Sequence, residues 1–113
     1  MLNWNGSSSM KEFKVIIETS ARRDILEIRR YIAKTLKEPA VAKRIYEAIK
    51  AAALTLDQNP MRHAVVLDEP YASLGVRPLP VENYIVFYIV DEHAKSVHII
   101  RVVYNRREWQ NVL

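Results

Sequence analysis

Residues 83–104 read NYIVFYIVDEHAKSVHIIRVVY, and this stretch decides the fold. Residues 83–91 and 96–104 are rich in valine, isoleucine and aromatic residues, which favour β-strands. The four residues between them, 92–95, have the length of a hairpin loop. Both segments are apolar on both faces over much of their length, so we expect these two strands at the centre of a sheet.

A shorter strand is expected immediately upstream, over residues 75–79. Pro78 and Pro80 lack backbone donors, so this strand is expected at an edge of the sheet. Residues 61–73 before it form the least regular stretch of the chain. A connection of this length in a small domain usually has a function or is mobile. Residues 105–113, after the last strand, are expected to form a short tail with one or two helical turns.

The N-terminal part of the chain predicts one strand followed by two helices. Residues 13–18 form the strand, and Thr19 or Ser20 supplies a side-chain oxygen that caps the first helix. Two sets of apolar residues recur at spacings of three and four, which place each set on one face of a helix. These sets are Ala21, Ile25, Ile28, Ile32 and Leu36, and then Ala42, Ile45, Ile49, Ala52 and Leu56. Residues 37–39 join the helices so closely that we expect an antiparallel hairpin, which ends at residues 59–60.

These elements predict an α+β fold with the order β-α-α-β-β-β. We expect an antiparallel-rich four-stranded sheet, with the αα-hairpin packed on one face and a short C-terminal helix or tail. The length of 113 residues suits a single domain, which we place at residues 10–113. Residues 1–9 carry no charged side chain and are interpreted as a tag or a disordered leader, because they lack the basic start and apolar middle of a signal peptide.

Composition narrows the classes of protein further. The chain has no cysteine, which excludes disulfides and cysteine-based metal sites and fits a reducing cytoplasm. Its longest uninterrupted apolar run, residues 84–90, is much shorter than the roughly 20 residues that span a bilayer, so no membrane contact is expected. Seventeen basic and 13 acidic side chains give a net charge of +4. This charge is compatible with a nucleic-acid or acidic-protein partner, although small basic proteins are also common.

Several motifs of the chain occur together in one family of proteins. Residues 75–79 read GVRPL, a short strand that contains an arginine. The next strand has the pattern Tyr-x-x-x-Tyr-x-x-Asp over residues 84–91, and residues 101–107 read RVVYNRR at the end of the last strand. Near the N-terminus, Ser-Ala-x-x-Asp-Ile follows the first strand at residues 20–25. In this order and spacing, the motifs resemble the RelE/ParE toxin superfamily, and the resemblance covers residues 10–113.

The resemblance implies that the chain is the toxin of a bacterial type II toxin–antitoxin pair. It also implies a cognate antitoxin whose extended or helical tail covers the toxin and neutralises it, with operator DNA contacted only through that complex. Superfamily members arrest growth by two main routes. RelE-like toxins cut messenger RNA at the ribosome, whereas ParE-like toxins bind and poison DNA gyrase. A third alternative is an inactive member that only binds its antitoxin and regulates expression.

RNA cleavage of the RelE kind would be metal-independent and would need no cofactor. The 2′-hydroxyl of the RNA is the nucleophile, so the protein must supply a proton acceptor, a proton donor for the leaving oxygen, and cations that hold the phosphorane charge. Arginine suits the cationic role because its guanidinium stays charged and can bond two phosphate oxygens. No pair of histidines has the spacing of metal ligands.

Four arginines and one tyrosine are the candidate catalytic or target-binding residues. They are Arg77, Arg101, Tyr104, Arg106 and Arg107. Arg101 stands among apolar strand residues, so it either pairs with an acid such as Glu82 or Asp91 or faces a cleft. Arg77 either binds phosphate or an acidic partner, or forms a structural ion pair. Arg106 and Arg107 follow the last strand, where functional basic residues fall in the family, and they are equally compatible with such a role and with solvated charge or antitoxin contact.

The aromatic and histidine candidates also have structural alternatives. Tyr104 is an acid/base or base-stacking candidate, but a half-buried strand tyrosine is the favoured interpretation. Tyr84 and Tyr88 lie four residues apart and therefore share one strand face, which favours core packing. His98 suits proton transfer, yet a lone histidine is more often structural.

Two features depart from the pattern of the RNA-cutting toxins. RelE-like toxins usually carry an arginine after the first tyrosine of the central strand, where this chain has Ile85. They also often carry a tyrosine or histidine in the C-terminal tail, whereas this tail offers Trp109. Removing one transition-state donor typically slows catalysis about 100- to 1,000-fold. The sequence therefore favours the ParE-like branch, in which binding to gyrase arrests growth.

Overall fold

The computed structural model describes residues 12–105 and Leu113. Its elements in chain order are β1 (Lys14–Ile17), α1 (Thr19–Arg30), the π-helical turn η1 (Tyr31–Thr35), α2 (Pro39–Leu54), the 3-10 turns η2 (Thr55–Asp57) and η3 (Pro60–Arg62), β2 (Arg77–Val81), β3 (Tyr84–Asp91) and β4 (Ser96–Tyr104). The predicted α+β class and the order β-α-α-β-β-β are therefore confirmed. None of the described helices is both long enough and apolar enough to cross a membrane.

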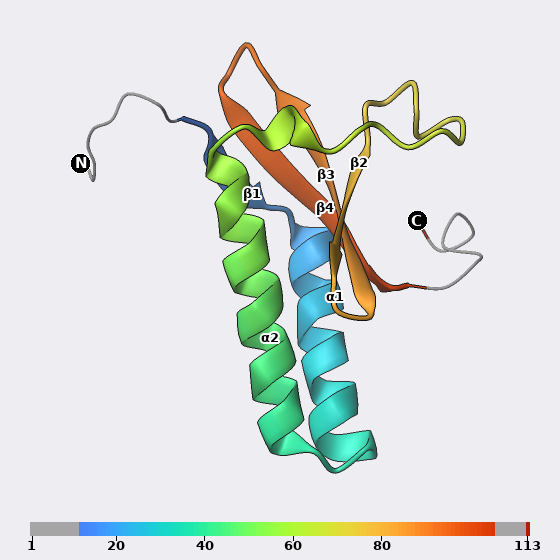
Figure 1. Cartoon of the computed structure of the whole chain (residues 1–113). Coiled ribbons are helices and arrows are strands. Elements are labelled where there is room, and N and C mark those ends of the chain that lie inside the picture. Colours follow the sequence, from blue (N-terminus) through green and yellow to red (C-terminus); the bar gives the residue numbers. More distant parts are fainter. Residues whose placement is uncertain (1–11, 106–112) are drawn as a thin grey trace.

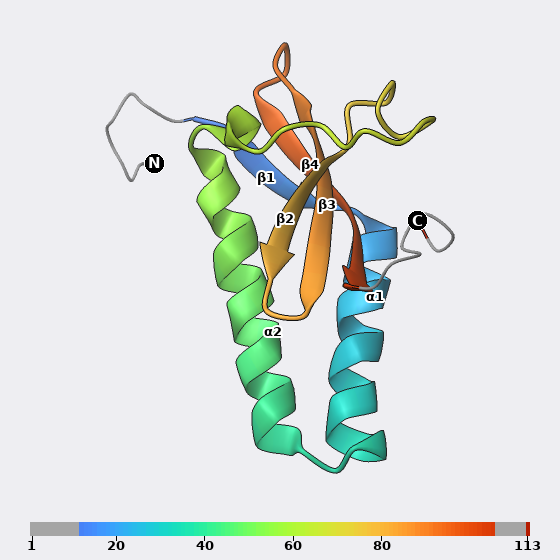
Figure 2. The same cartoon turned by 45° about the vertical axis from the view of Figure 1, so that its right-hand side comes forward.

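The four strands form one mixed sheet in the order β1-β4-β3-β2. The strand β3 pairs antiparallel with both β2 and β4, and β1 pairs parallel with β4. As predicted, β3 and β4 are central and the proline-containing β2 lies at an edge. The helix hairpin packs on one face of this sheet, and its far end extends beyond the strands (Figures 1 and 2).

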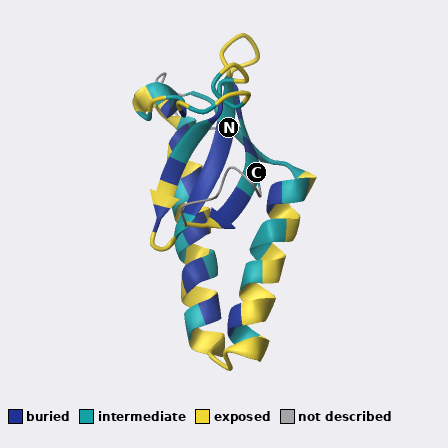
Figure 3. Ribbon diagram, turned by 90° about the vertical axis from the view of Figure 1, so that its right-hand side faces the viewer, coloured by how far each residue is buried: buried dark blue, intermediate teal, exposed yellow. Residues whose placement is uncertain are grey.

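Both faces of the central strands are covered by apolar side chains. The face toward the helices contains Val86 and Tyr88 of β3, packed with buried residues of α1 and α2 such as Ile45. The opposite face contains Ile85 and Phe87 and is covered by the connection before β2. Figure 3 shows the buried surfaces of the helices turned toward the sheet and their exposed surfaces turned outward. This two-sided burial explains why β3 is apolar without alternation.

The edge of β4 is covered by two different elements along its length. The strand β1 pairs with it only as far as Ile17, which lies opposite Ile99. At the next residue a β-bulge shifts the register, so that Tyr88 pairs with Ile99 and Phe87 pairs with Arg101. In the described part of the chain, no strand accompanies β4 on the β1 side beyond Ile99, and α1 lies there instead.

The predicted cap of the first helix is wrong. The residue before α1 is Glu18, and no side chain makes a cap hydrogen bond there. The Ser20 hydroxyl instead donates to the carbonyl oxygen of Ile100 at 2.7 Å. This carbonyl lies just past the end of β1, so the Ser20 side chain bonds a main-chain group at the edge of β4 and not an amide at the start of its own helix.

The predicted apolar stripe of the first helix is correct except at its last residue. Leu36 is 51% exposed, whereas Ile32 is buried. The helix widens into the π-helical turn η1, where the Leu36 amide donates to the carbonyl of Tyr31, five residues earlier. The additional residue in that turn rotates Leu36 away from the sheet. In α2, the predicted Ala42 is buried, but near the end of the helix the buried alanine is Ala53 and the predicted Ala52 is only partly buried.

The edge strand begins two residues later than predicted. Gly75 has a φ of +77°, which favours glycine, and its amide donates to the carbonyl of Ala72 in a turn. The ladder with β3 therefore starts at Arg77, opposite Tyr88, and ends at Val81. The expected helical turns of the C-terminal tail fall on residues 106–112, outside the described residues.

Candidate functional site

Arg101 is held by a carboxylate of the first helix. Its Nε donates to Oδ2 of Asp24 at 2.7 Å, and its Nη2 donates to Oδ1 at 3.1 Å. Asp24 also accepts the backbone amide of Val102 at 2.9 Å and is only 12% exposed. The hydrogen bond to Asp24 raises the pKa of the Arg101 guanidinium, against the opposing effect of burial. Of the two alternatives for Arg101, the geometry is that of an ion pair, with Asp24 as the acid rather than Glu82 or Asp91.

Arg77 is bonded to the connection that precedes its strand. One of its nitrogens, Nη1, donates to the carbonyl oxygen of His63 at 2.6 Å and more weakly to that of Met61 at 3.4 Å. These bonds hold the irregular connection against the start of β2. Arg77 lies opposite Tyr88, whereas Tyr104 lies opposite Tyr84. Because these tyrosines are four residues apart on β3, the two candidates are separated by about 13 Å along the strand.

Tyr104 ends β4 on an open surface. Its side chain is 54% exposed, and its ring meets the edge of Tyr84 with the centroids 5.7 Å apart and the planes at 78°. Burial is the main cause that raises the pKa of Tyr84, and the nearby Tyr104 and Tyr31 raise this pKa further. The candidates Arg106 and Arg107 follow directly in sequence but lie outside the described residues.

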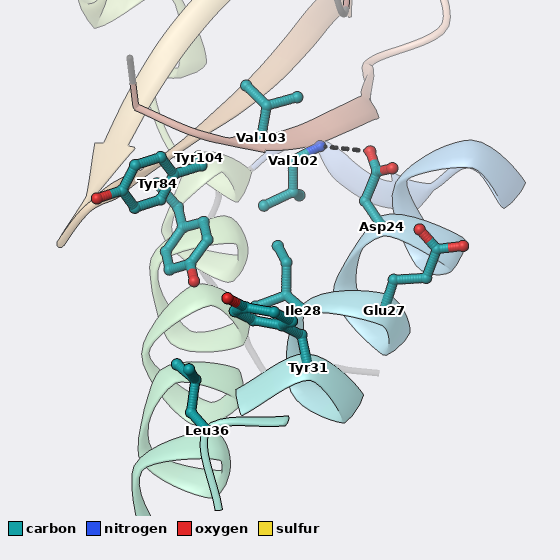
Figure 4. A pocket seen from close by; sticks show the side chains of 9 residues that line it. All are labelled: Asp24, Glu27, Ile28, Tyr31, Leu36, Tyr84, Val102, Val103 and Tyr104. Atoms are coloured by element: carbon teal, nitrogen blue, oxygen red, sulfur yellow. Dashed lines mark hydrogen bonds between the residues drawn. The ribbon is translucent and has the colours of Figure 1, made fainter. Parts of the chain in front are cut away.

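A groove of about 630 Å³ lies between α1 and the last residues of β4. Three tyrosines from three elements line it, and they are Tyr31, Tyr84 and Tyr104. Its other wall carries the carboxylates of Asp24 and Glu27 (Figure 4). We call this hollow the Tyr104 groove. Of the five candidate residues, only Tyr104 lines it, and none of the described candidate arginines does.

Ile85 stands at the position where RelE-like toxins usually carry an arginine, and it lies on the other face of the sheet. Ile85 is only 8% exposed and packs with Val66, Val76 and Phe87 under the connection before β2. His98 is also occupied, since its Nδ1 lies 2.6 Å from Oε2 of Glu18 and its Nε2 lies 3.0 Å from Oγ of Ser96. Neither residue faces the Tyr104 groove. The described residues contain no cluster of three or more histidines and carboxylates that could bind a metal ion.

The sequence contained a signal for the groove that the prediction did not use. Asp24, Glu27, Ile28 and Tyr31 have the spacing i, i+3, i+4 and i+7, so they form a second stripe on the first helix. This stripe is part acidic and part aromatic, so it does not stand out as an apolar core face. Recognising it as a wall of a site required knowing that β4 continues past the end of β1.

Comparison with known proteins supports this fold and assigns a family. The model of the ParE toxin of the type II toxin–antitoxin system parDE matches residues 15–109. A solved structure of the chromosomal ParDE system from P. aeruginosa is similar, with a TM-score of 0.68, 22% identity, and coverage of 83% of this chain and 97% of that chain. The RelBE2 toxin–antitoxin complex from Mycobacterium tuberculosis gives a TM-score of 0.62 and 26% identity, with coverage of 82% and 98%. No curated protein matches the chain. Because the family model covers most of the sequence, the chain belongs to the ParE toxin family of type II toxin–antitoxin systems.

Proposed function

We propose that this protein arrests bacterial growth by binding DNA gyrase, and that a cognate antitoxin binds and neutralises it. The family assignment supports the toxin role, and the two similar structures are a ParDE system and a RelBE2 toxin–antitoxin complex. The proposal places the protein in the cytoplasm, where gyrase acts on the chromosome. Operator DNA is contacted only through the complex with the antitoxin.

The internal pairing of the described arginines is the observation that most favours binding over RNA cleavage. Arg101 is bonded to Asp24, and Arg77 is bonded to backbone carbonyls of the connection. Holding a phosphorane requires guanidinium groups directed at the reacting phosphate. In the described part of the site, Tyr104 has the carboxylates of Asp24 and Glu27 as groove neighbours instead. Asp24 is neutralised by Arg101, so the carboxylate of Glu27 is the groove charge that would repel an RNA phosphate placed beside Tyr104.

The buried Ile85 supports the same choice. An arginine at this place belongs to the RNA-cutting pattern, and here the position is filled by a core residue at 8% exposure. Without such a transition-state donor, cleavage would be about 100- to 1,000-fold slower. A toxin that acts by occupying a protein target does not need this group. The expected target contacts include Tyr104 and the two arginines that follow it in the sequence, Arg106 and Arg107.

A supercoiling assay tests the proposed target. Purified protein is added to gyrase, ATP and relaxed plasmid, and supercoiling is expected to fall in proportion to the protein added. The double variant Arg106→Ala, Arg107→Ala is expected to lose most of the inhibition. The matched control is the double variant Lys34→Ala, Lys43→Ala, which also removes two positive charges, from exposed positions in η1 and α2, and should inhibit as the wild type does. Undiminished supercoiling with the wild-type protein would refute the proposed target.

Two further measurements separate the alternatives. Ribosomes that carry messenger RNA should keep it intact when the protein is added, and cuts at discrete sites would identify the RelE-like endonuclease instead. Induced expression without antitoxin should stop growth. Normal growth would leave the inactive regulatory member as the correct alternative. The antitoxin is tested by co-expressing the protein encoded next to this gene, which should co-purify with the toxin and restore growth.

A further inference from the structure

The Tyr104 groove combines three features that bear on its ligand. The first is its position beside the last residues of β4, on the side where β1 has ended. There α1 covers the strand, and its Ser20 and Asp24 bond the backbone of Ile100 and Val102. Beyond Val102 no described strand lies beside β4, and an unpaired strand edge offers main-chain donors and acceptors to an added extended segment. A ligand that lies in this groove therefore runs beside the end of β4.

The second feature is a local charge opposite to that of the whole protein. The chain has a net charge of +4, yet the two ionisable acids of the groove are Asp24 and Glu27. Asp24 is already paired with Arg101. Glu27 is exposed and forms no hydrogen bond or ion pair with the described residues, and its charge acts on Arg101 only as a neighbouring charge. Its carboxylate is thus available to a cation that arrives with a partner.

The third feature is exposed aromatic and apolar surface at the same place. Tyr31 and Tyr104 are each 54% exposed and Leu36 is 51% exposed, and all three line this groove. Figure 4 shows the tyrosines toward one end of the groove and the carboxylates toward the other. Aromatic rings attract lysine and arginine cations through their π faces. The aliphatic stems of these side chains also cover apolar surface such as that of Leu36.

We propose that the Tyr104 groove binds an extended segment of the cognate antitoxin that carries an arginine or lysine. The cation pairs with Glu27 at the carboxylate end of the groove, while neighbouring parts of the segment cover the rings of Tyr31 and Tyr104 and lie along the end of β4. This inference rests on the proposed function in one respect, namely that the protein has an antitoxin. It does not depend on gyrase as the target. A phosphate or nucleic-acid ligand is disfavoured because it would meet the carboxylate of Glu27.

The test compares two charge reversals that differ only in position. The protein encoded beside this gene is co-purified as the antitoxin, and its dissociation constant is measured with wild-type toxin, Glu27→Lys and Glu47→Lys. Glu47 is exposed on α2 and does not line the groove. Placing like charges together at an interface weakens binding on the order of 10- to 100-fold, so Glu27→Lys is expected to show this loss and Glu47→Lys to bind as the wild type does. Equal binding by the two variants would overturn the inference.

A rescue experiment identifies the partner cation. Each arginine and lysine of the antitoxin is changed to glutamate, and one of these variants is expected to bind Glu27→Lys about tenfold more tightly than wild-type antitoxin does. The double variant Tyr31→Ser, Tyr104→Ser should also lose about tenfold in affinity, with a melting temperature near that of the wild type. If no charge reversal rescues Glu27→Lys, the cationic segment is wrong. If wild-type toxin forms no complex at all, the antitoxin proposal itself fails, and this inference fails with it.

Discussion

Two tyrosines of β3 lie on the same face of the sheet, but their surroundings differ. Tyr88, midway along the strand, is completely buried and donates its hydroxyl proton to the carbonyl of Pro60 at 2.6 Å. Tyr84, at the start of the strand, is only partly buried and meets the exposed ring of Tyr104. We call the surroundings of Tyr88 the closed end and those of Tyr84 the open end. Pro60, in the chain between α2 and β2, covers the closed end, and the open end lies beside the last residues of β4, which extend beyond β1.

The closed and open ends differ in whether their polar groups are bonded inside the protein. At the closed end, the polar groups are satisfied within the protein, as Arg77 is by the carbonyl of His63. At the open end, Glu27 and Tyr104 remain available on the surface of a groove. Groups that already have internal partners contribute to the fold, whereas contiguous exposed apolar and aromatic surface is typical of interaction sites. Substitutions at the closed end should therefore change stability, and those at the open end should change binding.

The largest effect is expected from a substitution in the core that unfolds the whole domain, and with it both the closed and the open end. Ile45→Asp or Ile32→Asp places an unpaired carboxylate in the core between helices and sheet, where these side chains are 6% and 5% exposed. The cost should reach about 4–5 kcal/mol, which is most of the stability of a domain at the lower end of the usual range of about 5–15 kcal/mol and should prevent stable folding. Circular dichroism should show loss of the cooperative thermal transition. Leu36→Asp is the control, because Leu36 is 51% exposed and this variant should still fold.

A smaller but substantial effect is expected from breaking the tie between α1 and β4. Asp24→Ala leaves Arg101 and the amide of Val102 without their carboxylate partner. Removing one partner of a largely buried pair costs about 3–5 kcal/mol, and the partial exposure of Arg101 should reduce this to about 2–3 kcal/mol. Urea denaturation measures the change in the free energy of unfolding. Arg44→Ala breaks an exposed pair with Glu82 and should cost less than about 1 kcal/mol; equal losses in both variants would contradict the structural role of Asp24.

The tyrosine hydroxyls give a direct comparison of the closed and open ends. Tyr88→Phe removes the hydrogen bond to Pro60 and should lower the free energy of unfolding by about 1 kcal/mol. Tyr84→Phe removes a hydroxyl from the partly exposed ring at the groove and should change it by less than about 0.5 kcal/mol. Chemical denaturation of the two variants under identical conditions measures both values. A larger loss at Tyr84 would reverse the assignment of the two ends.

The smallest expected effect is on the dependence of stability on alkaline pH. Burial raises the pKa of Tyr88 above its ordinary value of 10.0, against the lowering effects of Arg77 and Arg62. The folded protein therefore holds this proton more tightly than the unfolded chain does. The resulting stability is present below pH 10 and is lost as pH rises through the folded pKa. Tyr88→Phe should lose less stability than the wild type between neutral pH and pH values above 10, as measured by urea unfolding at each pH; a steeper loss in the variant would contradict this.

Most of the fold could be predicted because it follows from local patterns. The β-branched runs predicted β3 and β4, the prolines placed β2 at an edge, and the spacing of isoleucines predicted the helix hairpin. The errors fall where a distant residue decides the local structure. Ser20 bonds the carbonyl of Ile100, 80 residues away, so no helix-capping rule could predict its partner. Leu36 is exposed because of a π-helical turn, which a period of 3.6 residues does not anticipate.

The candidate site was harder to predict than the fold for the same reason. Arg101 could be expected to have an acidic partner, but Asp24 is 77 residues away and becomes its partner only once β4 lies beside α1. Tyr104 was a candidate from its place at the end of the last strand. Glu27 and Tyr31 become candidates only because they line the groove, and the groove exists because β1 ends opposite Ile99. Charges and aromatic rings on one helix face do not by themselves distinguish a binding wall from a solvated surface.

The parallel pairing of the first strand with the last also constrains how this toxin is made. Lys14–Ile17 finds its only described strand partner in Ser96–Ile99, so the sheet cannot be completed until synthesis has passed residue 99. Contacts between such distant parts of a chain form slowly, because a long loop must close first. A polypeptide that stops before residue 96 therefore lacks β4, the partner of both β1 and β3, and cannot form this sheet.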